Sequence, residues 1–229
     1  MTSLSFSFPR IRRLPLFRTG IDRVLAASML FSCILVGLRI LHTGKYTFIF
    51  MIWNLFLAYV PYAISTWLAE RQAKAGIRII ALLLWLLFIP NSFYMLTDLY
   101  HLADGHRNTQ VPEWFDLSLI LSFAWNGLLL GVLSIRHIER LFIPGASIFR
   151  EWLFLYPIMW LNALGVYVGR YLRYNSWDIF LNPFQLLADI SGMIVHPLRH
   201  HYAWDMIFCF SILLTLMYSL IRKGSAALA

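Results

Sequence analysis

The chain has 229 residues, of which 60% are hydrophobic and 13% charged, and its formal net charge at pH 7 is +8. Its mean hydropathy is +0.67, and soluble domains carry about 25% charged residues, so this composition excludes a soluble globular protein and indicates one embedded in a membrane. The positive charge is expected to face anionic lipid of the bilayer, so we do not interpret it as a nucleic-acid-binding surface.

Residues 1–23 form a basic N-terminal tail ahead of the first apolar stretch. Phenylalanines and leucines alternate there with arginines and two prolines. One interpretation is a short, broken amphipathic anchor on the cytoplasmic membrane surface. The alternative is a disordered basic tail.

Six stretches are long and apolar enough to cross a bilayer, which takes about 20 residues each. They are, roughly, 24–41, 48–68, 77–96, 115–135, 152–168 and 204–221. Only short loops remain between them. The sequence therefore predicts an all-α fold, a polytopic bundle of about six transmembrane helices, with residues 24–229 as a single domain.

The distribution of the 19 Lys and Arg residues predicts the orientation of this bundle. If the N-terminus is cytoplasmic, 13 of them fall on the cytoplasmic side and 6 on the other. Cytoplasmic loops carry an excess of Lys and Arg, so both termini are predicted to be cytoplasmic. Most carboxylates and histidines then fall on the exoplasmic side, where the loops are longest.

The third apolar stretch ends in a polar face. Asn91, Tyr94, Asp98 and His101 follow one another at i, i+3, i+7 and i+10, which on a helix places them within roughly 80° of arc. Polar groups collected where an apolar segment meets water are costly unless a ligand or another helix pairs with them. This face is a candidate site.

Polar and small residues also recur on single faces of three other spans. They are Asn54, Pro61 and Ser65 in the second, Ser118, Ser122, Asn126, Gly127 and Gly131 in the fourth, and Ser211, Thr215 and Ser219 in the sixth. Small and hydroxylated residues let helices approach closely and form hydrogen bonds in lipid. We interpret these faces as helix-packing surfaces.

The fifth span is followed by charged residues. Asn162, Gly165, Gly169 and Arg173 recur at i, i+3, i+7 and i+11, with Arg170 beside them at the exoplasmic end. Arginine can hold a carboxylate or phosphate through two parallel hydrogen bonds, which favours an anionic ligand. The alternatives are an interfacial arginine pair or an ion pair with Asp98, Asp116 or Asp178.

A shorter apolar segment follows this end. Asn182 and Pro183 are typical of a helix start, and the next residues read FQLLADISGMIVHP. About 13 residues are too few to span comfortably. The segment is predicted to be a short interfacial or re-entrant helix that caps the exoplasmic face.

Three interpretations of the chemistry stay open. Asp98 and His101 could share a divalent metal with the last long loop, or His101 could act as a general base oriented by a carboxylate, with arginines holding an anionic substrate. The third interpretation is that these groups form structural bridges between helix ends. The chain contains no phosphate-binding glycine loop, HExxH, CxxC or GxSxG motif that would decide the matter.

Three blocks occur in order: LLFIPNSFYMLTDLYHL, WFDLSLILSFAWNGLLLGVLS and GRYLRYNSWD. In these blocks the chain resembles the bacterial membrane-protein family catalogued as domain of unknown function 1361. The resemblance covers most of the chain after the second span and implies a polytopic protein of the bacterial inner (plasma) membrane, without implying an activity. It includes the polar face of the third span and the arginines after the fifth.

Together these features predict a multi-pass membrane protein with an exoplasmic polar pocket that binds an anionic, lipid-linked or envelope-derived ligand. We assign catalytic roles to His101 and Asp98 should the protein act on that ligand as an enzyme, and no metal. The ligand-binding residues are predicted to be Asn91, Tyr94, Arg170, Arg173, Asn175 and Asp178. A small transporter or channel and a structural accessory subunit are the alternatives. Cofactors, oligomeric state and protein partners do not follow from the sequence.

Overall fold

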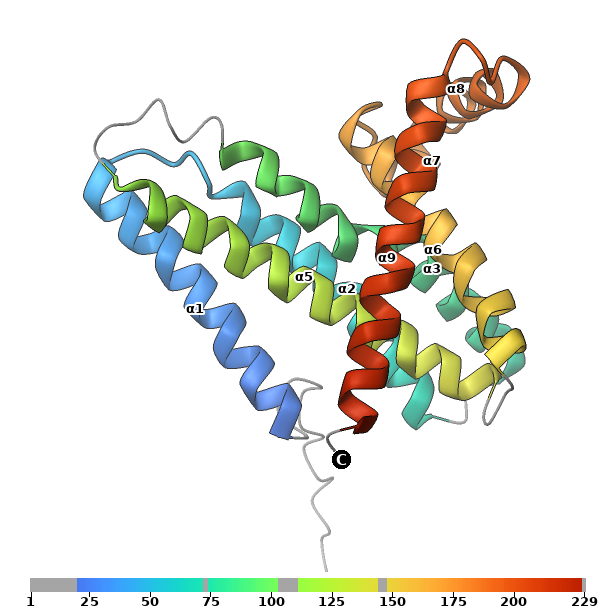
Figure 1. The fold of residues 1–229 in the computed structure, drawn as a ribbon, viewed down its shortest axis with the longest axis horizontal. Helices are drawn as coiled ribbons and strands as arrows, with labels where there is room; N and C mark the ends of the chain where they lie inside the picture. Colours follow the sequence, from blue (N-terminus) through green and yellow to red (C-terminus); the bar gives the residue numbers. More distant parts are fainter. Residues whose placement is uncertain (1–19, 72–73, 103–110, 144–147, 228–229) are drawn as a thin grey trace, which may run out of the picture.

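The computed structural model describes residues 20–71, 74–102, 111–143 and 148–227. All regular structure in these ranges is helical (Figure 1). The helices are α1 (Gly20–Thr43), α2 (Phe50–Glu70), α3 (Ala75–Thr97), the 3-10 helix η2 (Asp98–His101), α5 (Glu113–Phe142), α6 (Ile148–Arg170), α7 (Asp178–Leu181), α8 (Pro183–Val195) and α9 (His201–Ala227). The predicted all-α class is confirmed. The expectation for the basic tail falls almost wholly on residues 1–19, outside the described part.

Six of these helices are long and apolar enough to cross a membrane, as predicted, and α8 is the shorter apolar helix. The helices extend beyond the apolar stretches. The clearest case is α5, whose 30 residues span about 45 Å at 1.5 Å per residue, more than the roughly 30 Å hydrocarbon core. Its last turns carry Arg136, Glu139 and Arg140, so the helix continues after its apolar stretch ends.

The most buried span is α5, which packs against α1, α2 and α3. In its most apolar part 67% of the residues are buried, against 28% for α1 and α9, so α5 is the central helix. In turn α3 packs against α6, and α6 against α9. Figure 1 shows α7 and α8 toward the end of α9 that is remote from the C-terminus. We refer to these two ends of the bundle as the α8 end and the C-terminal end.

Glycines explain the close approach of α5 and α6 to α3. A Cβ atom on Gly127 would lie 2.5 Å from the backbone oxygen of Ser92, and one on Gly131 would lie 2.7 Å from the ring of Phe93. On α6, a Cβ atom on Gly165 would lie 2.6 Å from the ring of Pro90. The glycine pair of the fourth span therefore packs helices, as its spacing predicts.

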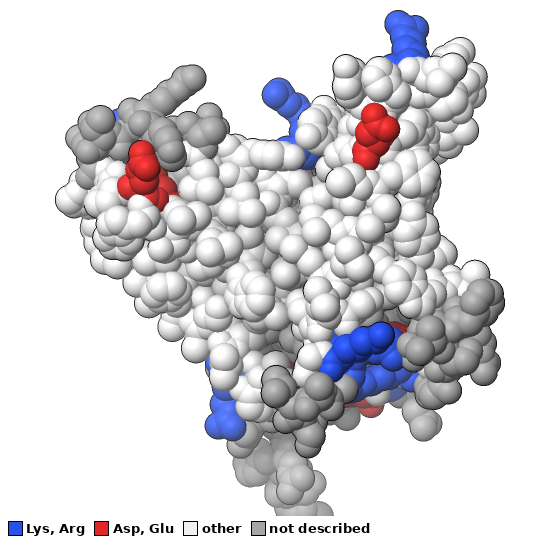
Figure 2. All heavy atoms as spheres, in the orientation of Figure 1, with Lys and Arg blue, Asp and Glu red and all other residues white. Residues whose placement is uncertain are grey.

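Charged residues join helices at both ends of the bundle. At the α8 end, Arg39 holds Asp116 through two hydrogen bonds of 2.7 and 3.0 Å. At the C-terminal end, Arg222 lies 2.7 Å from Glu139, which also accepts a hydrogen bond from Tyr218. Figure 2 shows charged atoms at the two ends of the molecule, with an uncharged band between them on the face drawn. That is the distribution expected of a protein surrounded by lipid.

Candidate binding site between α2, α3 and α6

An ion pair joins the end of α3 to the end of α6. Arg170 Nη2 lies 2.5 Å from Asp98 Oδ1, and the side chain of Asp98 is completely buried. The second oxygen of the carboxylate accepts a hydrogen bond of 3.1 Å from Asn54 on α2. Both oxygens of Asp98 are therefore bound within the protein, and the carboxylate links three helices.

The other nitrogens of Arg170 also have partners. Its Nε donates to Thr97 Oγ1 at 2.9 Å, and Nη1 lies 3.3 Å from His101 Nε2. The guanidinium group stacks over the ring of Tyr94, 4.5 Å from its centroid. Because a guanidinium group can only donate hydrogen bonds, Nε2 of His101 is the acceptor in this contact.

The predicted polar face of α3 is thus directed at α6. Tyr94, Asp98 and His101 all contact Arg170, although the chain changes from α to 3-10 geometry at Asp98. The fourth residue of the face, Asn91, donates a hydrogen bond of 2.9 Å to Ser176, in the segment after α6. The face is therefore covered by α6 and the residues that follow it.

The segment after α6 turns sharply. Because α6 ends at Arg170, the expected stripe of Asn162, Gly165, Gly169 and Arg173 ends at Gly169. Arg173 has a left-handed backbone (φ 61°), and the amide of Tyr174 donates to the carbonyl of Val168 at 3.2 Å. The prediction that Arg173 continues the face of the helix is wrong, because the reversal takes it off the helix.

The remaining predicted residues of this segment belong to its internal hydrogen bonding. Asp178 accepts hydrogen bonds from the backbone amide of Asn175 at 2.6 Å and from its side chain at 3.3 Å. The side chain of Arg173 is exposed. In the described part of the chain it makes none of the ion pairs or hydrogen bonds seen for Arg170.

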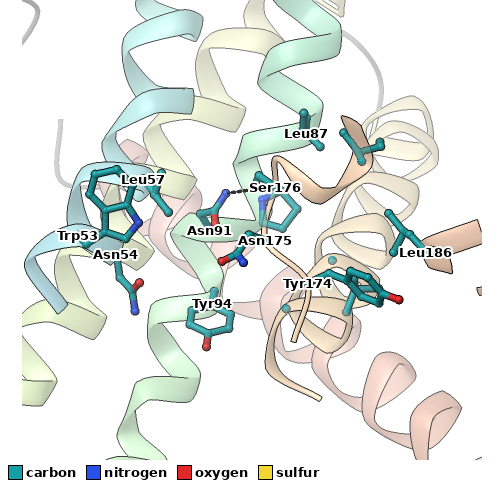
Figure 3. Close-up of a pocket in the computed structure, with 15 residues that line it drawn as sticks. Trp53, Asn54, Leu57, Leu87, Asn91, Tyr94, Tyr174, Asn175, Ser176 and Leu186 are labelled. Atoms are coloured by element: carbon teal, nitrogen blue, oxygen red, sulfur yellow. Dashed lines mark hydrogen bonds between the residues drawn. The ribbon is translucent and has the colours of Figure 1, made fainter. Parts of the chain in front are cut away.

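A cavity of about 180 Å³ lies beside the ion pair (Figure 3). It is lined by α2, α3 and α6 and by the chain from Tyr174 to Leu186, and it is partly open. Its lining consists of Trp53, Asn54, Leu57, Leu87, Pro90, Asn91, Tyr94, Gly165, Val168, Gly169, Tyr174, Asn175, Ser176, Ile179 and Leu186. None of these residues is charged, and their polar side-chain groups are amides, hydroxyls and one indole set among apolar residues.

The cover of the cavity is fixed by two contacts of α8. Tyr174 donates a hydrogen bond of 2.7 Å to Asp189 on α8, and this bond raises the pKa of the Tyr174 phenol, as does the negative charge of Asp189. On the other side, Trp204 of α9 donates to the carbonyl of Met193 at 3.1 Å. The short helix is therefore attached to both the cavity wall and the last span.

The sequence interpretation missed the contribution of α2. The sequence predicts a packing face for Asn54 and gives no signal at Trp53, yet both line the cavity. The only available signal was the polar face of Asn54, Pro61 and Ser65, which does not reveal which helix it meets. Tyr174 and Ser176 were also missed, although both lie next to the predicted residue Asn175.

The arrangement does not supply a metal site from the described side chains. No group of three His, Cys, Asp or Glu residues with suitable positions occurs in the described ranges. Asp104 and His106, which follow His101 in the sequence and are of metal-ligating types, lie outside those ranges. Asp98 and His101 share Arg170 as a common partner.

The fold and this site define a multi-pass membrane protein with an uncharged cavity, lined by both polar and apolar residues, at one end of its helix bundle. The chain belongs to the family described as protein of unknown function (DUF1361), whose model matches residues 53–217. That range includes all residues that line the cavity, and it confirms the family resemblance seen in the sequence. No curated protein and no solved structure matches the chain.

Proposed function

We propose that this protein binds an amphipathic, lipid-linked or envelope-derived molecule in the cavity, at the exoplasmic face of a bacterial plasma membrane. The observation that carries the proposal is the composition of the cavity along the helix axes. Among the lining residues carried by the spans, Leu87 lies seven residues before Tyr94 on α3, which is about 10 Å deeper into the bundle, and Leu57 is likewise deeper than Asn54 on α2. The apolar residues Ile179 and Leu186 belong to the cover after α6. A molecule with a polar head and an apolar chain matches this gradient.

An anionic group on the ligand would meet Arg173 rather than Arg170. Arg170 is fully engaged by Asp98, Thr97 and His101. Arg173 is exposed and adjoins Tyr174, which lines the cavity. We therefore assign Arg173 to the rim and Asn91, Tyr94 and Asn175 to the cavity itself. Arg170 and Asp178 act by holding the surrounding chain in place.

The exoplasmic location rests on the excess of basic residues at the opposite end. Arg71, Lys74, Arg78, Arg140 and Arg222 lie near the ends of α2, α3, α5 and α9 that are remote from the cavity. Figure 2 shows Lys and Arg atoms gathered at the C-terminal end. Because basic residues favour the cytoplasmic side, the cavity then opens to the exoplasmic side, with both termini in the cytoplasm.

A transporter is less well supported than a binding protein. The buried charged residues Arg39, Asp98, Asp116 and Glu139 each pair with an oppositely charged residue near a helix end. Asp22, near the start of α1, is also buried and accepts a hydrogen bond from Tyr62. Transport pathways typically place ionisable residues deep within spans, where they face a water-filled route. If the protein is instead a structural accessory subunit, a bulky side chain introduced into the cavity should leave the amount of bound lipid unchanged.

Catalysis by Asp98 and His101 stays a prediction. A general base needs a free lone pair directed at the proton it removes, whereas Nε2 of His101 is directed at Arg170. Enzymatic action would require Arg170 to leave this contact when the ligand binds. Binding is therefore the function that the contacts support best.

The test is the lipid content of the purified protein. Val168 lines the cavity on α6, and Val195 is exposed on α8 outside it, so Val168→Phe and Val195→Phe form a matched pair. The wild type and Val195→Phe are expected to retain the same amphiphile after purification in a mild detergent, measured by mass spectrometry of the extract. Val168→Phe is expected to lose it. Equal retention by the two variants would reject the proposal.

A further inference from the structure

We propose that the part of the ligand held inside the cavity is a neutral, hydroxyl-rich ring, the chemistry of a glycosyl head group carried on a lipid. This inference rests on the proposed function and specifies the ligand of the same cavity. Four properties of the lining support it: charge, hydrogen-bonding capacity, size and aromatic surface.

The charge around the cavity disfavours an ionic head group. The lining contains no charged residue, and Arg170, whose guanidinium stacks on the lining residue Tyr94, already binds the buried carboxylate of Asp98. An anion could reach Arg170 only by leaving Asp98 buried without its partner, which is strongly unfavourable. A cation in the cavity would be repelled by the positive charge of Arg170, which stacks on the cavity residue Tyr94. A neutral head group avoids both conflicts.

The amides of the lining have oxygen atoms to spare. Asn54 directs its NH₂ group at Asp98, and Asn91 directs both hydrogens of its NH₂ group at the carbonyl of Phe88 and at Ser176. These partners fix the amide orientations, and neither Oδ1 atom accepts a hydrogen bond from the described residues. An amide oxygen can accept two hydrogen bonds, so the ligand is expected to donate.

Asn175 adds to this pattern. Its NH₂ group makes a long contact of 3.3 Å with Asp178, which leaves its own oxygen as a third acceptor. Figure 3 shows Asn91 and Asn175 close together, with Ser176 hydrogen-bonded to Asn91. A phosphate or sulfate group offers mainly acceptors and matches these oxygens poorly. Hydroxyl groups both donate and accept, so they match the amides and the hydroxyl of Ser176.

The size of the cavity corresponds to one six-membered ring. Its volume is about 180 Å³, and an engineered cavity of about 150 Å³ holds benzene. Trp53, Tyr94 and Tyr174 contribute aromatic surface to the lining. The C–H groups on one face of a sugar ring can pack against such a surface while its hydroxyls reach the amides.

The experiment compares amphiphiles that share a dodecyl chain and differ only in their head groups. The full-length protein is prepared in a polyoxyethylene dodecyl ether, whose head offers no hydroxyl cluster. Dodecyl glucoside, whose head group is a single ring, dodecyl phosphate and dodecyltrimethylammonium are then added separately, and retained molecules are measured by native mass spectrometry. We expect one dodecyl glucoside to bind about tenfold more tightly than the two ionic amphiphiles.

Variants show whether this binding uses the cavity. Asn175→Leu removes an amide of the lining, while Asn182→Leu changes an exposed asparagine that does not line it. We expect Asn175→Leu to weaken glucoside binding about tenfold and Asn182→Leu to leave it unchanged. Ser176→Ala is a second, smaller change in the lining, expected to weaken binding in the same direction.

The outcomes separate this inference from the proposed function. Preferential binding of dodecyl phosphate or dodecyltrimethylammonium, weakened by Asn175→Leu, would overturn the sugar-like head and keep the cavity as an amphiphile site. If none of Asn175→Leu, Ser176→Ala and Val168→Phe weakens the binding of any amphiphile, both the sugar-like head group and the proposed function are overturned. Equal binding of all head groups would reject the hydroxyl-rich ring.

Discussion

Arg170 and Asp98 connect the last residue of α6 to the first residue after α3, with their closest atoms 2.5 Å apart and the carboxylate wholly buried. The pair fixes the relative position of two of the helices that enclose the cavity. The third helix, α2, is attached to the same carboxylate through Asn54. The carboxylate of Asp98 therefore links the three spans that line the cavity, although neither Asp98 nor Arg170 lines it.

Removal of this pair is expected to destabilise the protein. Arg170→Gln leaves Asp98 buried without its counter-charge, a loss of about 3 to 5 kcal/mol in the free energy of unfolding. Arg173→Gln changes an exposed side chain and is expected to shift the free energy by no more than about 0.5 kcal/mol. Thermal unfolding in detergent measures both. Similar stability of the two variants would mean that Arg170 is not a structural bridge.

A double substitution refines this test. Asp98→Leu combined with Arg170→Met replaces both charges by apolar side chains, and such replacements are often neutral or stabilising. We therefore expect the double variant to be more stable than Arg170→Gln alone. If it is not, the contacts of Arg170 with Thr97 and His101 contribute more than the ion pair does.

Much of the fold could be predicted from the sequence, because hydropathy alone locates the spans. The polar face on α3 was also predictable, since helical spacing brings Tyr94, Asp98 and His101 together even though the last turn is a 3-10 turn. The choice between Arg170 and Arg173 was not predictable. It depends on where α6 ends, and the left-handed turn at Arg173 has no glycine to indicate it.

The role of α2 could not be read from its own residues either. Asn54 resembles the other polar residues that pack helices in lipid, and only the arrangement of α2 beside α3 brings it to Asp98. A single sequence gives the polar face of each helix but not the neighbour that the face meets. The cavity is therefore a product of packing between helices.

The glycines of α5 provide a test of that packing. Gly127→Ala places a Cβ atom 2.5 Å from the backbone oxygen of Ser92, so α5 and α3 must separate, and we expect a loss of about 1 to 3 kcal/mol of stability. Gly37→Ala on α1 is the control, because nothing lies within 4 Å of its added Cβ atom. Alanine favours helix over glycine by up to about 1 kcal/mol, so Gly37→Ala should be neutral or stabilising in the same unfolding assay.

The orientation in the membrane can be measured with reporter fusions. The basic asymmetry predicts that fusions after Gly105 and near His200 behave as exported, and that fusions after Lys74, Gly145 and Ala229 behave as cytoplasmic. An alkaline phosphatase and a fluorescent reporter give opposite signals and serve as mutual controls. A cytoplasmic result at Gly105 would place the cavity on the cytoplasmic side and reject an exoplasmic ligand.

The attachment of α8 to the cavity wall depends on the hydroxyl of Tyr174. Tyr174→Phe removes its hydrogen bond to Asp189, so we expect faster hydrogen exchange of the backbone amides in residues 183–195. Tyr202→Phe is the control, because the Tyr202 side chain is 80% exposed and lies outside the cavity. The two variants should differ while the exchange of α5 stays the same in both.

The same bond predicts a pH dependence with a definite sign. Because the folded protein raises the pKa of Tyr174 above that of a free phenol, the contribution of the bond is fully present below the ordinary tyrosine pKa of about 10. It is lost as the pH rises through the raised value, when the phenol ionises beside Asp189. Exchange of residues 183–195, corrected for intrinsic rates, should therefore increase in the wild type at strongly alkaline pH. Tyr174→Phe should show no such step, and an identical step in both proteins would show that another group controls α8.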